Sequence, residues 1–156
     1  MSKIAIFPGS FDPFTLGHES IVKRSLKLFD KIIVAIGVNS GKVPLMSVES
    51  RVAMVNEIFK NEPKVECDYF EGLTVDFCKK AGANYMLRGI RTSADFEYER
   101  AIAQVNKKML PEVESVFLLT NPEHTPINST IIRDIIRNGG DASQFLPESI
   151  DIRKYL

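Results

Sequence analysis

Residues 8–18 combine glycine, proline and histidine in a spacing that suits phosphate binding. Gly9 allows a sharp turn and a close approach of a ligand to the backbone, and Gly17 and His18 stand where a helix is expected to begin. Free N–H groups and the dipole at a helix N-terminus favour an anion, to which a histidine can add a directed hydrogen bond. The plainer alternative is that glycine and proline only shape a turn, which His18 caps.

Two arginines follow a later apolar run. Arg88 and Arg91 flank Gly89 and Ile90, so that two guanidinium groups could reach phosphates from two sides. Arginine suits phosphates because its charge is permanent and its N–H groups form a fork. A pair of solvated surface charges is the alternative interpretation.

A third segment, residues 124–130, leads into another expected helix. Ser129 and Thr130 could offer hydroxyls and first-turn amides to a triphosphate, although Ser129 could also be a plain N-cap. Lys42 adds one more cation, which taken alone would be a surface lysine. The sequence shows no Ser-His-Asp arrangement and no paired carboxylates, which argues against covalent or acid–base hydrolysis.

Alternating apolar runs and helical segments predict how these segments are positioned. Strands are predicted at 4–7, 31–38, 65–70, 85–88 and 116–119, and helices from residue 17, after an N-cap at Ser47, and at 74–81, 95–109 and 129–137. The run 31–38 is continuously apolar, as in a strand buried on both faces. The pattern predicts an α/β fold: a single-domain, doubly wound (Rossmann-like) sheet of five parallel strands with helices on both faces, over residues 1–156. Ligands bind such sheets beyond the carboxyl ends of the strands.

Composition narrows the class of protein. The chain has 156 residues, and 20 Lys and Arg balance 20 Asp and Glu, whereas a general nucleic-acid binder is usually basic. Cys67 and Cys78 are too few for a disulfide scaffold and lack the spacing of a zinc site. The first residues resemble no signal peptide, and the apolar run 32–38 is too short to cross a membrane. We therefore expect a soluble cytoplasmic protein that binds neither nucleic acid nor membrane.

Residues 9–18 resemble the first signature of the nucleotidyltransferase superfamily, (H/T)xGH, with Thr15 at its first position and His18 at its last. The segment 88–91, followed by the acidic and aromatic residues 95–99, resembles one branch of that superfamily, the bacterial phosphopantetheine adenylyltransferases. Residues 127–133 look like that branch's Ile-Ser-Ser-x-x-x-Arg motif, with Asn128 in place of the first serine. The resemblance runs from Lys3 to about Pro147.

The resemblance implies an adenylyltransferase that joins ATP and 4′-phosphopantetheine to give dephospho-coenzyme A and pyrophosphate, by direct in-line attack. It implies that His18 stabilises the α-phosphate in the transition state. The substrate-binding residues that it implies are Ser10, Lys42, Leu73, Thr74 and Arg88, of which Leu73 and Thr74 would contact the pantetheine arm. The ATP-binding residues that it implies are Ser10, Phe11, His18, Gly89, Ile90, Arg91, Glu99, His124, Thr125, Pro126, Ile127, Asn128, Ser129 and Thr130.

The resemblance also carries expectations about cofactors and partners. Mg²⁺ is expected to arrive bound to the triphosphate of ATP rather than in a protein-only site. A homohexamer and feedback by coenzyme A are expected from the family. Two alternatives stay open: a sister adenylyl- or cytidylyltransferase for another phosphorylated acceptor such as nicotinamide mononucleotide, whose branches typically have His where Thr15 stands, and a sensing or scaffold domain that binds nucleotide without turnover.

Overall fold

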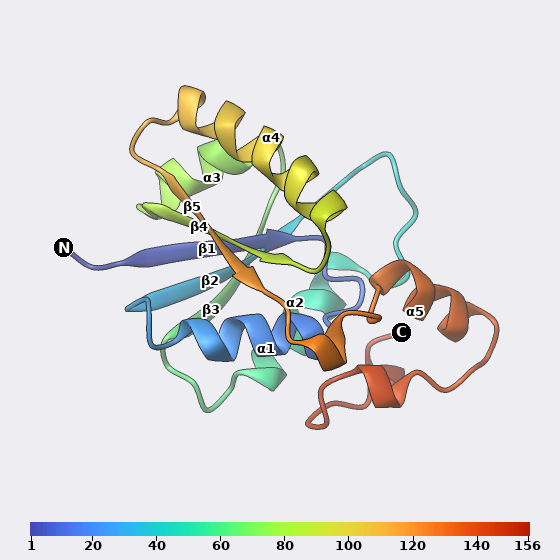
Figure 1. Cartoon of the computed structure of the whole chain (residues 1–156). Coiled ribbons are helices and arrows are strands. Elements are labelled where there is room, and N and C mark those ends of the chain that lie inside the picture. Colours follow the sequence, from blue (N-terminus) through green and yellow to red (C-terminus); the bar gives the residue numbers. More distant parts are fainter.

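The most apolar runs of the chain form the centre of a parallel sheet. The computed structural model describes residues 1–156, and its strands are β1 (Ile4–Gly9), β2 (Lys31–Gly37), β3 (Val65–Phe70), β4 (Tyr85–Ile90) and β5 (Glu114–Leu119). The strands are all parallel and lie in the order β3-β2-β1-β4-β5 (Figure 1). β1 and β2 are buried along most of their length, whereas β5 lies at an edge and is half-buried. The predicted fold class is confirmed.

Helices cover both faces of the sheet. They are α1 (Leu16–Ser25), α2 (Val48–Ile58), α3 (Thr74–Ala81), α4 (Ser93–Met109) and α5 (Ser129–Arg137), with short 3-10 turns η1 (Pro122–His124), η2 (Ser143–Phe145) and η3 (Ile152–Lys154). α1 and α2 lie on one face and α3 and α4 on the other, while α5 lies beyond the carboxyl edge of the sheet (Figure 1).

The side chains of each strand alternate between two cores. Ile32 and Val34 of β2 point into the core under α1 and α2, which also buries Val22 and Met54. Ile33 and Ala35 point the other way, into the core that holds Val75, Phe77 and Cys78 of α3. Because both faces are filled, only the ends of the strands are open to a ligand.

The sheet opens between β1 and β4. These strands pair only at Ala5 and Ile6, whereas β1 pairs with β2 along its whole length. From β1 to β3 each new strand is added on the same side of the previous one. The chain then crosses back over the sheet, so that β4 pairs with the other side of β1. This reversal is the switch point at which doubly wound sheets bind ligands.

Several element boundaries differ from the predicted ones for local reasons. α4 begins at Ser93 instead of Asp95 because Thr92 caps it: the Thr92 side chain accepts the N–H of Asp95, and the Asp95 side chain in turn accepts the N–H of Thr92. α5 is capped by Asn128, whose Oδ1 accepts the N–H of Thr130 at 2.8 Å, so the interpretation of Ser129 as the N-cap is wrong. Ser47 caps α2 as predicted.

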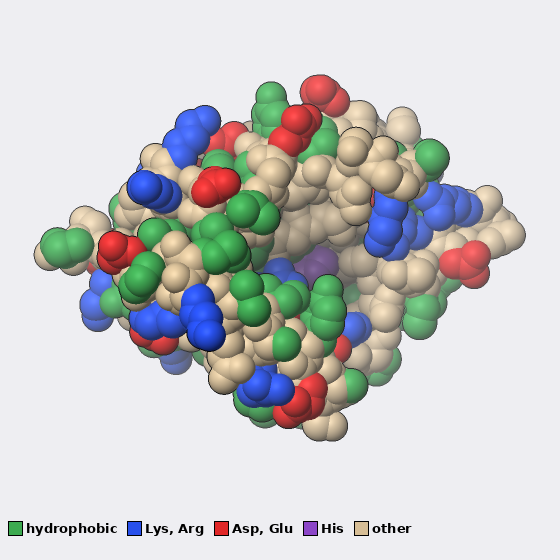
Figure 2. All heavy atoms as spheres, turned by 90° about the horizontal axis from the view of Figure 1, so that it is seen from above, with side chains coloured by type: hydrophobic (Ala, Val, Ile, Leu, Met, Phe, Trp, Pro, Cys, Tyr) green, Lys and Arg blue, Asp and Glu red, His purple; other side chains and the backbone are tan.

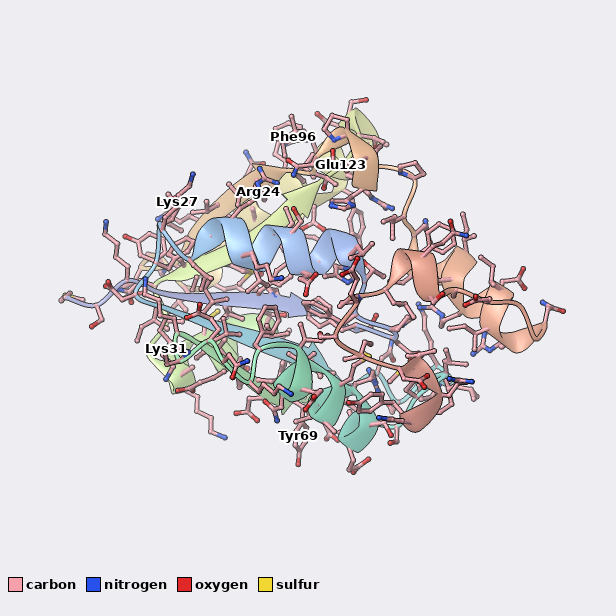
Figure 3. The ribbon with its side chains drawn as sticks, turned by 90° about the horizontal axis from the view of Figure 1, so that it is seen from below. Arg24, Lys27, Lys31, Tyr69, Phe96 and Glu123 are labelled. Carbon is pink, nitrogen blue, oxygen red and sulfur yellow. The ribbon has the colours of Figure 1, made fainter.

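The end of β5 and the end of α1 are joined by a long side chain. Arg24 Nη1 donates to the carbonyl of Leu119 at 2.9 Å, and Figure 3 shows Arg24 on the side of α1 that faces this edge of the sheet. This bond fixes the carboxyl end of β5, which leads into the segment 120–130. No helix in the structure combines the length and the apolar character that crossing a membrane requires.

Candidate active site

A cavity of about 350 Å³ lies at the carboxyl ends of β1 and β4. Figure 2 shows the hollow, with histidine and with lysine or arginine colours visible inside it. Its lining comes from all three segments singled out in the sequence, and consists of Phe7, Pro8, Gly9, Ser10, Phe11, Thr15, Gly17, His18, Ile21, Arg88, Gly89, Arg91, Asp95, Glu99, Thr120, His124, Ile127, Asn128, Ser129 and Thr130. The topology therefore brings these segments into one place.

His18 is held by the start of its own helix. Thr15 is the N-cap of α1, and its backbone N–H donates to Nδ1 of His18 at 3.0 Å, while its side chain accepts the N–H of His18 at 3.4 Å. Nδ1 therefore acts as an acceptor. In a neutral imidazole the proton must then lie on Nε2, which is left as a hydrogen-bond donor.

Three phenylalanine rings surround the imidazole. The ring centroids of Phe7, Phe11 and Phe14 lie 6.1, 4.9 and 5.3 Å from that of His18. Burial, with the positive charges of Arg88 and Arg91, lowers the pKa of His18 to about 3. The side chain is neutral at pH 7 and cannot serve as a proton reservoir near neutrality.

Phe11 owes its place to an unusual backbone and to a neighbouring glycine. It has a φ of 48°, in the left-handed region that phenylalanine rarely adopts. Its ring lies so close to Gly9 that a Cβ there would meet the ring at 2.9 Å. The packing of Phe11 therefore favours glycine at position 9.

Arg88 is fixed by a carboxylate and a carbonyl. Its Nε and Nη2 donate to the two oxygens of Glu99 at 2.9 and 2.7 Å, and its Nη1 donates to the carbonyl of Pro8. Three of the five N–H groups of a guanidinium are thus engaged, which leaves two for a ligand. Glu99 is buried, so the interpretation of this residue as an exposed helical charge is wrong.

Arg91 is fixed from two other elements. Its Nε donates to Asp95 at 3.3 Å and its Nη1 to the carbonyl of Ile127 at 3.0 Å. Asp95 also accepts the backbone N–H of Arg91 at 3.0 Å, so that the cap of α4 and the arginine share one carboxylate. The interpretation of Arg88 and Arg91 as freely solvated charges is wrong, since both are half-buried and hydrogen-bonded.

The N-terminus of α5 faces the same cavity. Ser129 Oγ donates to the carbonyl of Pro13 at 3.3 Å, and Arg133 donates to the carbonyl of Asp12 at 2.9 Å. These bonds join the start of α5 to the loop between β1 and α1. The N-termini of α1 and α5 therefore both lie at the cavity, where their free N–H groups favour anionic ligands.

The structure does not bring every predicted site residue into the cavity. Lys42 lies in the exposed loop between β2 and α2, and Leu73 and Thr74 lie at the start of α3; none of them lines the cavity. Ile90, Thr125 and Pro126 also lie outside its lining, next to residues that line it. His18 and Arg88 therefore share one cavity, whose lining does not include Lys42.

Other residues of the site were missed by reasoning from the sequence. Asp95 and Thr120 line the cavity, and Asp12 and Arg51 lie buried behind it. A capping-box spacing, Thr92 with Asp95, could have indicated Asp95. No local pattern indicates Asp12, because its partners Leu45 and Met46 are distant in the chain, and none indicates the bond from Arg51 to the distant carbonyl of Ser10. The structure gathers no group of three or more His, Cys, Asp or Glu that could hold a metal ion.

Comparisons with known proteins show the family of the chain. Residues 6–135 match the cytidylyltransferase-like family. The phosphopantetheine adenylyltransferase of Flavobacterium psychrophilum is 54% identical over 149 residues, which cover 96% of this chain and 98% of that relative. The phosphopantetheine adenylyltransferase of Cytophaga hutchinsonii is 49% identical over 150 residues, which cover 96% of this chain and all of that relative.

A solved structure shows the same fold at low identity. It is a bifunctional NMN adenylyltransferase/ADP ribose pyrophosphatase from Francisella tularensis, with a TM-score of 0.71 and 19% identity; the match covers 94% of this chain and 45% of that chain. This likeness concerns the fold alone, whereas the two curated relatives match almost end to end. The chain therefore belongs to the cytidylyltransferase-like family and, within it, to the phosphopantetheine adenylyltransferases.

Proposed function

We propose that this chain transfers the adenylyl group of ATP to 4′-phosphopantetheine, giving dephospho-coenzyme A and pyrophosphate, and that residues 1–156 act as one nucleotidyltransferase domain. The observation that carries the proposal is a neutral His18 with a free Nε2 donor, in one cavity with Arg88 and Arg91. The near end-to-end match to phosphopantetheine adenylyltransferases supports the choice of acceptor.

The reaction needs placement of charged groups more than acid–base catalysis. A phosphomonoester has a second pKa near ~6, so at neutral pH the acceptor phosphate is already a dianionic nucleophile. One of its oxygens forms a bond to the α-phosphorus while the bond to the pyrophosphate oxygen breaks in line. Catalysis then consists of bringing two repelling phosphates together and stabilising the charge that builds on the α-phosphate.

His18 is proposed to supply that stabilisation. Its Nε2–H donates to an α-phosphate oxygen, and the fixed Nδ1 keeps the ring in the orientation that does so. A charged imidazolium would not be needed, since Arg88 and Arg91 already supply positive charge. The imidazole is therefore proposed as a donor and not as a nucleophile or a base.

The remaining roles are divided between the two substrates, and some of the residues lie beyond the cavity lining. Ser10, Lys42 and Arg88 are proposed to place the acceptor phosphate, with Leu73 and Thr74 on the pantetheine arm. Arg91, Glu99 and the N-terminus of α5 are proposed to hold ATP. Mg²⁺ is proposed to enter as the complex with ATP, because triphosphate oxygens are the hard ligands that Mg²⁺ prefers. Coenzyme A, which shares the pantetheine arm, is proposed to compete for the same acceptor site.

The direct test is turnover. The purified protein is incubated with ATP, Mg²⁺ and 4′-phosphopantetheine, and dephospho-coenzyme A and pyrophosphate are measured, with nicotinamide mononucleotide as a parallel acceptor. We expect equal amounts of both products with 4′-phosphopantetheine and little pyrophosphate with the mononucleotide. Pyrophosphate only with the mononucleotide would favour a sister enzyme, and ATP binding without pyrophosphate would favour a sensing domain.

Substitution of Lys42 tests the division of the site. We expect Lys42→Ala to raise the KM for 4′-phosphopantetheine and to leave the KM for ATP almost unchanged, because Lys42 lies outside the cavity, whereas Arg91, Glu99 and the start of α5, which are proposed to hold ATP, line it. Lys27→Ala is the matched control, since Lys27 is an exposed lysine in the turn after α1 (Figure 3). An equal rise in both KM values would contradict the division.

We also propose that copies of the chain assemble, as a homohexamer. α4 exposes an apolar stripe, which consists of Tyr98, Ile102, Val105 and Met109 at spacings of four, three and four residues. Such spacing places the four side chains on one side of a helix. Figure 2, which views the molecule from the side of α4, shows hydrophobic side chains gathered on this face. A contiguous exposed apolar patch is typical of a protein–protein interface.

A further inference from the structure

Two opposite charges lie buried behind the cavity, each bonded to backbone. Asp12, in the loop between β1 and α1, and Arg51, on α2, are each 5% exposed. Neither lines the cavity, and they form no ion pair with one another. Charged side chains are seldom buried to this extent without a partner for each polar group.

Asp12 holds the end of the loop that carries Lys42. Its Oδ2 accepts the N–H of Leu45 at 2.8 Å, and its Oδ1 accepts the N–H of Met46 at 2.9 Å. Both oxygens of one carboxylate are therefore used by two consecutive residues of the β2–α2 loop. Hydrogen bonds to a charged acceptor are the stronger kind, and burial shields these two from water.

Arg51 makes the reverse connection. Its Nε donates to the carbonyl of Met46 at 3.2 Å, and its Nη1 donates to the carbonyl of Ser10 at 2.8 Å. The backbone N–H of the buried Met46 thus donates to Asp12, and its carbonyl accepts from Arg51. Two side chains therefore join the β1–α1 loop to the β2–α2 loop. Asp12 belongs to the first loop and binds the second, and Arg51, on the helix after the second loop, binds both.

We infer that Asp12 and Arg51 are positioning residues, which fix the loop carrying Lys42 against the loop carrying Ser10 and His18 and so set the binding site for the acceptor phosphate. The inference rests on the proposed function for the role of Lys42. Without the two links the loop would still be attached to β2 and α2, but Leu45 and Met46 would no longer be tied to the β1–α1 loop, and the segment that carries Lys42 would be freer to move. Lys42 would then meet the acceptor phosphate less often, while the arginines that face ATP would keep their own partners.

Asp12→Asn is the sharpest test. Asparagine keeps the size and one oxygen acceptor, but its NH₂ group faces a backbone N–H that already donates. We expect the KM for 4′-phosphopantetheine to rise by about ten- to a hundredfold, as for other substitutions of groups that orient a binding residue, with the KM for ATP little changed. Arg51→Lys keeps the positive charge but loses the guanidinium that donates to two carbonyls at once, and we expect it to raise the same KM.

A matched control separates positioning from general loss of stability. Asp30→Asn also removes a carboxylate that accepts a backbone N–H, that of Lys3 at 2.7 Å, at the opposite end of the sheet. Thermal melts of all variants come first, and if Asp12→Asn does not fold, Arg51→Lys carries the test. The second readout is trypsin cleavage after Lys42, which we expect to be faster in Asp12→Asn and Arg51→Lys than in Asp30→Asn.

A double substitution tests whether Asp12 acts through Lys42. If it does, Asp12→Asn adds nothing to the acceptor KM of Lys42→Ala, whereas independent effects would multiply. The inference is overturned if the acceptor KM and the cleavage rate change no more than in Asp30→Asn, or if both substrates weaken equally. Failure of the proposed function looks different: Lys42→Ala then leaves the acceptor KM unchanged, and faster cleavage after Lys42 still decides whether the two charges hold the loop.

Discussion

His18 differs from an ordinary histidine in both of its ring nitrogens. Free imidazole titrates near pH 6.5, whereas burial and two nearby arginines lower the pKa of His18 to about 3. The backbone N–H of Thr15 donates to Nδ1, so Nε2–H is the one donor that remains on the ring. In its proposed role the residue is a fixed neutral dipole, which would need no reorganisation when charge develops on a phosphate.

Removal of this donor should slow the chemical step. We expect His18→Ala to lower kcat by about 10²–10³, the usual effect of removing one preorganised donor at a developing charge. The measurement is steady-state release of pyrophosphate at saturating ATP and 4′-phosphopantetheine. Near-normal turnover of His18→Ala would remove the proposed role.

The same residue makes stability depend on pH. An unfolded chain takes up a proton on this histidine below about pH 6.5, whereas the folded protein does so only near pH 3. Protons therefore favour unfolding: the contribution of neutral His18 is fully present above about pH 6.5 and is lost as the pH falls toward 3. We expect the urea midpoint to fall less between pH 7 and 4.5 in His18→Asn than in the original protein. Parallel falls in the two proteins would contradict this assignment.

At the scale of elements, the strands were more predictable than the loops between them. The run from Lys31 is apolar at every buried position, so the pattern alone identifies a central strand. The loop with Lys42 carries no such pattern, and its place depends on Asp12, which is more than thirty residues away in the chain. Glu99 shows the same limit, because its burial follows from Arg88 on another element.

The pairing of β4 with α4 predicts that Glu99 affects both substrates. Because Glu99 holds two N–H groups of Arg88, we expect Glu99→Gln to raise the KM for 4′-phosphopantetheine as well as that for ATP. Glu97→Gln is the control, since Glu97 lies on the same helix and pairs with the exposed Arg100 at 3.0 Å. The KM for each substrate is measured separately. A rise in the KM for ATP alone would show that Arg88 holds its position without the Glu99 carboxylate.

At the scale of the whole molecule, strand order explains why three distant segments meet. The reversal between β1 and β4 could be expected from five alternating strands, and it places residues 8–18 beside residues 88–91. The short pairing of β1 with β4, which opens the cavity, could not be expected, since nothing in either strand's composition specifies where pairing stops. The proposed assembly of copies likewise depends on which apolar side chains are exposed, and the spacing of apolar residues in the sequence does not distinguish exposed side chains from buried ones.

The stripe on α4 makes assembly testable. We expect Val105→Lys to dissociate the proposed oligomer, because Val105 is 56% exposed at the middle of the stripe and a charge there would have to be desolvated in the proposed interface. Mass is measured by light scattering during size-exclusion chromatography. Leu28→Lys is the control, since Leu28 is exposed in the turn after α1. An unchanged mass for Val105→Lys would place the interface elsewhere.

The first turn of α1 and the imidazole of His18 form one structural unit, because the Thr15 N–H that donates to Nδ1 belongs to the N-cap residue of that helix. Fraying of this single turn would release the ring to rotate and to take up protons while the sheet stayed intact. Mild denaturant should therefore abolish turnover at a concentration where circular dichroism still reports a folded protein. Inactivation and unfolding would be two separate events in this enzyme.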